Sequence, residues 1–311
     1  MKNVMKVLVP IDGSNQSLAA VRYIGGVLKP EKTKIVLFHV DPAMPESFWD
    51  LEQSPEFRSK LAPVRAWVTQ QKNFIDDGMT KAGKILYKSG FPADAVSVKI
   101  QTRKTGISRD ILHEATDEDY KMVVVGRTGI SKFKDLVLGS VANKLIGNLV
   151  NIPLVVVGGK PNPNKFIIAF DSSKGSMRSV STVAAILNNA ISEIMICHVI
   201  RSIGIEKLTL SETPLPEFDW AELCVKKIEP AIEEAKRRFV SAGLDSEKIY
   251  GKILTEKPSR AGCIIAEAKA GGFGTIVVGR RGLSAVEEFF IGRVSRKVLH
   301  MAKKMAVWIV N

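Results

Sequence analysis

The sequence predicts an α/β chain of two flavodoxin/Rossmann-like domains, each a five-stranded parallel sheet of order 3-2-1-4-5 with helices on both faces. Three observations predict it. Short apolar runs alternate with stretches of helical periodicity, the runs are apolar on both faces as in a covered parallel sheet, and a set of landmarks occurs twice. The 311 residues are enough for two hydrophobic cores of ordinary size.

The first half has the order βαβαβαβαβ. Its helices are indicated by periodic apolar residues from Leu18 to Leu28, from Phe57 to Leu86 and from Ile111 to Ala115, with a fourth helix beginning at Gly139. Its strands are expected at Lys6–Ile11, Lys34–Val40, Ser97–Gln101, Met122–Val125 and Leu154–Val157. With right-handed crossovers, this order places the ends of the first and fourth strands side by side, where such sheets bind ligands.

The second half repeats the first. Asp12 recurs 159 residues later as Asp171, and Gly139 recurs 153 residues later as Gly292, so only six residues are lost between landmarks. A long helix is expected at Glu217–Ala242. Strands are expected at Lys165–Phe170, Glu193–Val199, Lys252–Leu254, Thr275–Val278 and Val307–Val310. The turn-rich stretch 158–163 then predicts domains at 1–160 and 161–311.

A glycine pattern follows the fourth strand of the first half. Gly126, Gly129, Gly139 and Ser140 fit G-x2-G-x9-G-[ST]. Glycines at a strand end let backbone N–H groups approach phosphate oxygens, and a helix that begins after Gly139 attracts anions to its amino end. The pattern predicts a phosphate-binding loop.

The run from Val9 to Ser14, the motif Phe38-His39-Val40 and the glycine pattern together resemble a universal stress protein domain of the ATP-binding branch. The resemblance covers nearly the whole chain, twice, and implies ATP as ligand, with magnesium at its phosphates. It implies that Asp12 and the backbone at Val40 hold the adenosine part. The residues that it implies for ATP binding in the first half are Ile11, Asp12, Val40, Gly126, Arg127, Gly129, Gly139, Ser140 and Val141.

The second half departs from the pattern, because Arg293 stands where the family has Ser or Thr. Arg293 either grips phosphate in a charge-assisted pair or fills the pocket and leaves Arg280 and Arg281 as surface charge. Ser295 offers a hydroxyl on another face of the helix. The candidate nucleotide site of this half comprises Asp171, Val199, Gly279, Arg280, Gly282, Gly292, Arg293 and Ser295.

Other residues have simpler interpretations that stay open. Asp12 alone is also typical of a turn before a helix, with Ser14 and Ser173 as helix caps, and the glycines alone are typical of a loop that needs positive φ. His39 and His198 are expected to be packed strand-end histidines, because no nucleophile or carboxylate partner is visible for them. No catalytic residue and no metal-ligand cluster is expected from the sequence.

The composition of the chain limits which partners and which cellular location are expected. The net charge of +13 is divided almost evenly between the halves and mixed with acids, which favours anions in general but makes nucleic acid an unexpected partner. The three cysteines lack metal-ligand or disulfide spacing. No apolar run is long enough for a membrane span or a signal peptide, so a cytoplasmic location is expected.

The resemblance implies a nucleotide-responsive regulatory module that acts in the stress response, with at most slow ATP hydrolysis. One alternative is an enzyme of the adenine-nucleotide α-hydrolase-like fold, which carries a different loop where Asp12-Gly13-Ser14 stands here. Another is a scaffold that acts by protein contacts without nucleotide. The last strand of each half is an apolar edge, so the halves are expected to pack as an intramolecular pseudo-dimer; a homodimer and an unknown protein partner are further expectations.

Overall fold

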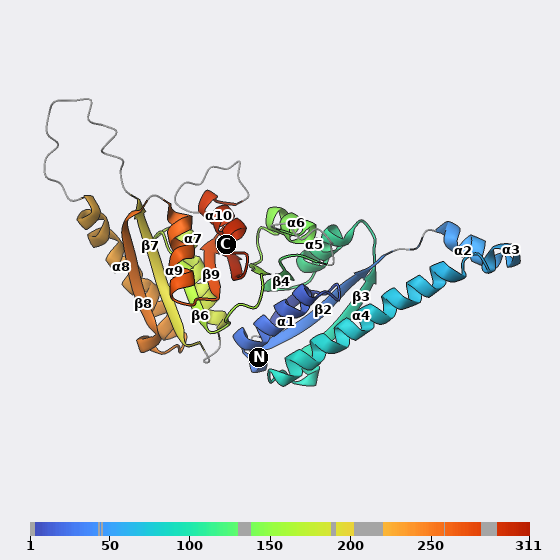
Figure 1. Ribbon diagram of the computed structural model, residues 1–311. Helices are drawn as coiled ribbons and strands as arrows, with labels where there is room; N and C mark the ends of the chain where they lie inside the picture. The colour runs from blue at the N-terminus through green and yellow to red at the C-terminus, as the bar shows by residue number, and fades with distance from the viewer. Residues whose placement is uncertain are drawn as a thin grey trace, which may run out of the picture. The chain divides into compact units, whose positions relative to one another are not determined.

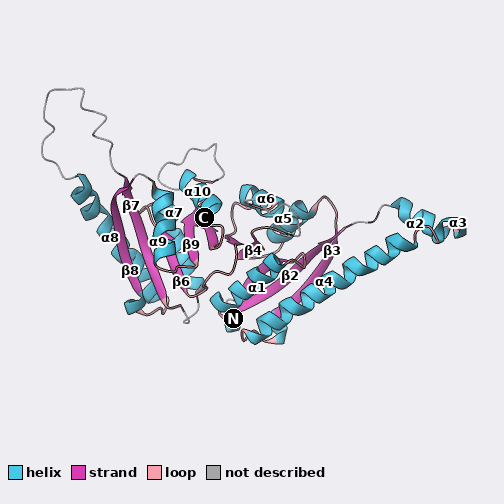
Figure 2. Cartoon of the chain, in the orientation of Figure 1, coloured by secondary structure: helices cyan, strands magenta, loops and turns pink. Residues whose placement is uncertain are grey.

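The computed structural model describes residues 4–42, 44, 46–129, 138–187, 191–201, 220–257, 259–280 and 291–311. These residues form two compact units, Met1–Gly25 with Pro30–Val157 (unit 1) and Gly26–Lys29 with Gly158–Asn311 (unit 2). Figure 1 shows the helices and strands of each, and Figure 2 shows the alternation of helix and strand along the chain.

Unit 1 contains a parallel sheet in the order β3-β2-β1-β4-β5. The strands are β1 (Met5–Pro10), β2 (Thr33–Asp41), β3 (Val96–Thr102), β4 (Met122–Gly126) and β5 (Leu154–Val157). The helices are α1 (Asn15–Val27), α2 (Glu46–Gln53), α3 (Pro55–Arg58), α4 (Ala62–Lys88), α5 (Ile107–Asp117) and α6 (Ser140–Asn148). Every residue of β5 is buried, as expected for a strand with both faces covered.

Unit 2 repeats this order as β10-β9-β6-β7-β8. Its strands are β6 (Lys165–Ala169), β7 (Glu193–Arg201), β8 (Ile249–Lys257), β9 (Thr275–Gly279) and β10 (Ala306–Val310), and its helices are α7 (Lys174–Ile186), α8 (Trp220–Ser241), α9 (Arg260–Ala270) and α10 (Arg293–Met301). Helix α7 packs beside α8 and α9 beside α10, so helices cover both faces of the sheet. The predicted fold class is confirmed in both units.

The repeat extends to side-chain contacts. Lys99 on β3 pairs with Glu114 on α5 at 2.7 Å, and Lys252 on β8 pairs with Glu267 on α9 at the same distance. Each pair ties the third strand of a unit to the helix that follows it. The landmark displacement of the sequence therefore corresponds to equivalent positions in three dimensions.

Several boundaries differ from the sequence prediction, and two of these differences have a clear physical cause. The long segment from Phe57 is broken into α3 and α4, and Pro63 lies in the first turn of α4, where a missing N–H is tolerated. Strand β8 is longer than predicted because Gly251 does not break it. A β-carbon on Gly251 would lie 2.4 Å from Ile232 Cγ2, so this glycine lets α8 approach the sheet closely.

Candidate functional site

The candidate site of unit 1 lies where β1 and β4 end at the same edge of the sheet. The two strands are neighbours, with Val7 opposite Met122 and Leu8 opposite Val123. Asp12 follows β1 and the glycine loop follows β4. The topology therefore brings together the two motifs that the sequence singled out separately.

Asp12 performs two tasks in this arrangement. Its Oδ1 accepts a hydrogen bond from the Ser14 N–H at 3.0 Å, and the Ser14 hydroxyl in turn accepts from the Ser17 N–H at 3.1 Å at the start of α1. The other carboxylate oxygen faces the glycine loop, since a β-carbon on Gly129 would lie 2.5 Å from Asp12 Oδ2. The turn role is confirmed, and it leaves one carboxylate oxygen directed at Gly129.

Gly139 closes the loop against the end of β4. Its N–H donates to the Arg127 carbonyl at 2.8 Å, and a β-carbon there would lie 3.2 Å from both Arg127 O and Thr128 Cα. Among the described glycines with positive φ, none belongs to this pattern; Gly139 itself has φ −68° and ψ 155°. The interpretation that the loop needs glycine for positive φ is wrong. These positions require glycine because a β-carbon would lie too close to neighbouring atoms of the chain.

Gly126 has a packing role instead. A β-carbon there would lie 2.8 Å from the carbonyl carbon of Gln16 in the first turn of α1. The close approach holds the amino end of α1 against the end of β4. Gly126 thus positions the turn that carries Asp12.

The amino end of α6 completes this edge. Gly139 is the N-cap residue, Ser140 is exposed, and Val141 is partly exposed. The first N–H groups of an α-helix have no acceptor within the helix, and the helix dipole makes this end favourable for anions. Arg127, in contrast, is only 5% exposed, and burial lowers its pKa.

The strand-end histidines bond to the backbone, as predicted, but the expectation that no carboxylate lies near them is wrong for His39, whose Nε2 lies 3.1 Å from Asp41 Oδ1. The Nδ1–H of His39 donates to the Ile11 carbonyl at 2.7 Å, while Ile11 N–H donates to Phe38 O at 2.7 Å. His198 repeats the contact with Phe170 O at 2.8 Å. These bonds tie the ends of the first two strands of each unit together. Val40 follows His39 and is 5% exposed.

Unit 2 keeps the scaffold of the site. Asp171 Oδ1 accepts from the Ser173 N–H at 3.1 Å, and the Ser173 hydroxyl caps α7 by accepting from the Ser176 N–H at 3.0 Å. Gly292 is the N-cap of α10 and donates its N–H to the Arg280 carbonyl at 2.7 Å. Gly282 and Arg281 lie outside the described residues.

The polar residues of unit 2 contradict the interpretation in which Arg293 fills the pocket and Arg280 is surface charge, whereas a phosphate grip by Arg293 stays a prediction. Arg280 is 3% exposed and its Nε donates to Asn311 Oδ1 at 2.7 Å, so it is not surface charge. Arg293 is exposed at the first position of α10 and does not fill a pocket. Ser295 is buried and its hydroxyl donates to Gly279 O at 2.7 Å, which directs it to the backbone.

Three important positions were not singled out from the sequence. Gly13, beside Asp12, has φ +76°, whereas its counterpart Ser172 has φ 58° without being glycine. Asp110 in α5 is buried and organises the loop after β3. Arg260, the first residue of α9, reaches the Val199 carbonyl at 3.4 Å. Comparing the two halves position by position would have found Ser172 and Arg260.

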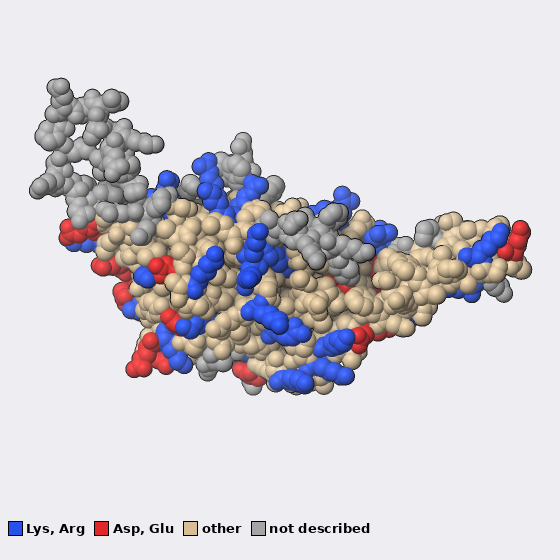
Figure 3. Space-filling model, viewed as in Figure 1, with Lys and Arg blue, Asp and Glu red and all other residues tan. Residues whose placement is uncertain are grey.

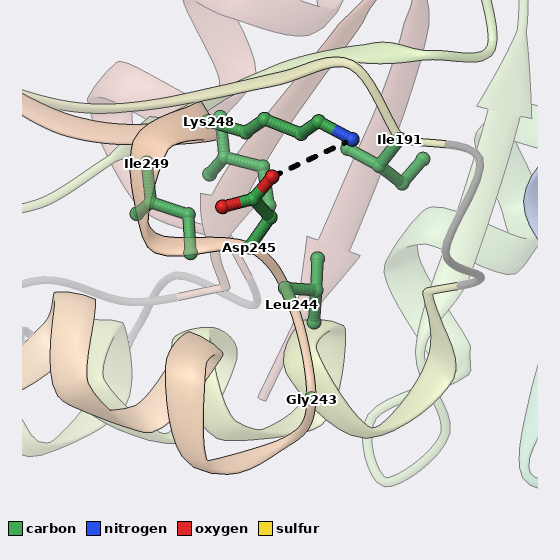
Figure 4. A pocket seen from close by; sticks show the side chains of 7 residues that line it. Ile191, Gly243, Leu244, Asp245, Lys248 and Ile249 are labelled. Atoms are coloured by element: carbon green, nitrogen blue, oxygen red, sulfur yellow. Dashed lines mark ion pairs between the residues drawn. The ribbon is translucent and has the colours of Figure 1, made fainter.

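A cavity of about 210 Å³ lies elsewhere in unit 2. Figure 4 shows it between the loop after α8 and the beginning of β7 and β8, with Lys248 and Asp245 3.9 Å apart at its rim. Parallel strands start at this edge, opposite to the edge that carries the glycine loop. The cavity is therefore separate from the candidate site.

Basic and acidic side chains are interspersed on the surface of the molecule. On the face shown in Figure 3, Lys and Arg side chains form separate groups among acidic and uncharged residues. Within the part of the chain that the structure describes, no three or more His, Cys, Asp or Glu gather as metal ligands. Nor does any described helix have the length and apolarity needed to cross a membrane.

Comparisons with known proteins agree with this architecture. A model of the universal stress protein family matches residues 3–158 and again residues 163–311. Universal stress protein YxiE of Bacillus subtilis is 29% identical over 143 residues, which make up 45% of this chain and 93% of that protein.

Several solved structures match both units, including the following two. A universal stress protein from Archaeoglobus fulgidus gives a TM-score of 0.56 at 17% identity, covering 100% of this chain and 99% of that chain. The protein PA1789 from Pseudomonas aeruginosa gives 0.51 at 16% identity, covering 99% and 93%. At these identities the two structures show a shared fold.

Proposed function

The chain belongs to the universal stress protein family, and from this premise we propose that unit 1 binds ATP and that the protein is a nucleotide-responsive regulatory module. The observation that carries the proposal is the meeting of Asp12, the glycine loop and the exposed amino end of α6 at one edge of the sheet, with the loop packed closely against the Asp12 carboxylate. A β-carbon on Gly129 would meet the Asp12 carboxylate at 2.5 Å, and one on Gly139 would meet the Arg127 carbonyl at 3.2 Å.

Each part of the ATP molecule has a proposed partner at this edge. Backbone groups of the glycine loop and the first N–H groups of α6, at Ser140 and Val141, would donate to the phosphates. Asp12 and the backbone at Ile11 and Val40 would hold the adenosine part. Magnesium would be held by phosphate oxygens and water, which suits its preference for oxygen ligands and its reluctance to dehydrate.

The contacts of His39 and Asp12 support a binding role for unit 1 over a catalytic one. Efficient phosphoryl transfer needs an oriented nucleophile, a metal and a base. In this unit His39 Nδ1–H donates to the Ile11 carbonyl and its Nε2 faces Asp41, while Asp12 Oδ1 accepts from the Ser14 N–H. The described contacts of both residues therefore involve backbone and a carboxylate and not a nucleophile. We propose that any ATP hydrolysis is slow and that the response to stress, in the cytoplasm, comes from nucleotide occupancy.

A Gly139→Val variant tests ATP binding by unit 1. The branched side chain would enter the space beside Arg127 O and Thr128 Cα, and we expect at least ~2 kcal/mol of lost binding, the value of one or more charged hydrogen bonds. Isothermal titration calorimetry with ATP and magnesium measures the loss. Mass spectrometry of the nucleotide released from freshly purified protein identifies the natural ligand.

Gly147→Val is the matched control for this experiment. Gly147 lies in the same helix, α6, and a β-carbon there has no atom within 4 Å. It should therefore leave ATP affinity unchanged. Equal affinities in the wild type and Gly139→Val would remove the glycine loop from the site.

We also propose that the two units associate through their last strands, β5 and β10. Each strand would otherwise be an exposed apolar edge, which invites pairing with another chain. Val156→Pro removes a backbone donor from β5 and should increase susceptibility to limited proteolysis and enlarge the particle in small-angle scattering. No change in either measurement would contradict association through this edge.

A further inference from the structure

The two units differ in charge at one corner of the proposed nucleotide edge. In unit 1, His39 Nε2 lies 3.1 Å from Asp41 Oδ1, so the strand-end histidine faces a carboxylate. The residue of unit 2 at the position of Asp41 is Ile200, which is buried. This corner of unit 2 therefore lacks the acid of unit 1.

Unit 2 has a cation, Arg260, near the same strand end. Arg260 begins α9 as Ile107 begins α5, and the two positions are 153 residues apart, like the other landmarks of this part of the chain. Ile107 is 47% exposed, so unit 1 has an exposed apolar side chain at the position equivalent to Arg260. Arg260 gives unit 2 a guanidinium group.

The Arg260 side chain extends to the end of β7. Its Nε donates to the carbonyl oxygen of Val199 at 3.4 Å. The pairing of β7 with β8 shifts register between Val199 and Arg201, so this carbonyl lies where the regular ladder is interrupted. Val199 is the counterpart of Val40, whose backbone is proposed to hold adenosine in unit 1.

The charge of Arg260 also affects the pKa of the neighbouring histidine, His198. Burial lowers the pKa of the His198 imidazole, the Phe170 carbonyl raises it, and the positive charge of Arg260 lowers it. Asp171 acts on the same ring in the opposite direction to Arg260. Arg260 therefore contacts Val199 and acts on the charge of the adjacent His198, at the strand end equivalent to the one proposed to hold adenosine in unit 1.

We infer that Arg260 excludes the adenosine part of a nucleotide from unit 2, and that this residue sets the different selectivity of the two units. A purine would have to displace the guanidinium from the Val199 carbonyl, and it would find a cation where Ile107 offers an apolar surface. The inference rests on the proposed function only for the choice of adenosine as the excluded group.

The test is a gain of binding in Arg260→Ile, because misfolding cannot produce a gain. Calorimetry with ATP is expected to show one further ATP per chain relative to the wild type. Titration with inorganic tripolyphosphate, which has the phosphate chain without the nucleoside, should show no gain. Lys269→Ile is the matched control, since Lys269 is exposed at the other end of α9.

The reciprocal change examines unit 1. Ile107→Arg should weaken its ATP binding at least ~10-fold, whereas Ile107→Leu should leave it unchanged. A wild type with one ATP per chain and no gain in Arg260→Ile would overturn the inference and leave the proposed function standing. If the wild type binds no ATP and Arg260→Ile binds one ATP per chain, the inference stands and the proposed ATP binding by unit 1 is contradicted. A wild type that already fills both units would overturn the inference.

Discussion

Asp110→Ala is expected to lower the free energy of unfolding by about 2–3 kcal/mol at neutral pH, because it removes a buried acceptor of three hydrogen bonds. The Asp110 carboxylate accepts from the Thr105 N–H at 3.0 Å, the Thr105 hydroxyl at 2.7 Å and the Lys104 N–H at 2.8 Å. Asp110 is only 2% exposed. Water therefore cannot fully replace it in the loop between β3 and α5.

The same carboxylate should make stability depend on acid. Burial acts to raise the pKa of Asp110, but the hydrogen bonds from Thr105 and Lys104 outweigh it and hold the pKa at about 2, below the ordinary 3.8. A lowered pKa in the folded state stabilises the fold above the unfolded pKa. That contribution is lost as the pH falls from about 4 through about 2.

Urea denaturation at pH 7 and at about pH 2.5 measures both effects. The difference in unfolding free energy between the wild type and Asp110→Ala should narrow by about 1–2 kcal/mol at the acid pH. Asp117→Ala, at the exposed end of α5, is the control and should show little difference at either pH. If the difference in unfolding free energy between the wild type and Asp110→Ala stays constant with pH, the loop does not stabilise the ionised carboxylate.

Gly13→Ser is expected to destabilise the protein by about 2–3 kcal/mol, and Ser172→Gly to stabilise it by about 0.5–1 kcal/mol. Gly13 has φ +76°, and a β-carbon there would lie 2.3 Å from Phe74 Cε1 on α4. The substitution therefore adds both backbone strain and a clash. Ser172 already carries the strain at φ 58°, and glycine would relieve it at the cost of a more flexible unfolded chain.

The pair is informative because the same two residue types are exchanged at equivalent positions. Urea midpoints of the two variants should move in opposite directions from that of the wild type. Gly147→Ser serves as a control for serine in place of glycine where no neighbour is close. Midpoints that move the same way would mean that the two turns are not conformationally equivalent.

Much of the fold was predictable because its signals are local and occur twice. Apolar runs located the strands, and the displacements of 159 residues for Asp171 and 153 residues for Gly292 from their counterparts fixed the correspondence between halves. Boundaries were less predictable where a residue acts through a distant neighbour. Gly251 continues a strand because Ile232 needs the space, and that contact is invisible in the sequence around either residue.

The glycine pattern located the edge of the candidate site, but not the reason for each glycine. Gly126 is needed by Gln16, Gly129 by Asp12, and Gly139 by the Arg127 carbonyl. Spacing alone cannot separate contact with a ligand from contact with the chain. Arg260 matches no motif at all, and it stands out only when its position is compared with that of Ile107.

The contact between α4 and the turn that carries Asp12 lies far from the amino end of the helix. A β-carbon on Gly78 would lie 3.1 Å from Gly13 Cα, so the helix rests almost directly on the turn backbone. Figure 1 shows α4 continuing toward α2 and α3 at its amino end. From Gly78 to Ala62 the helix extends ~24 Å, at ~1.5 Å per residue. A tilt of ~5° about this contact would displace Ala62 by ~2 Å, so a small change in the angle of the helix becomes a large displacement at its amino end.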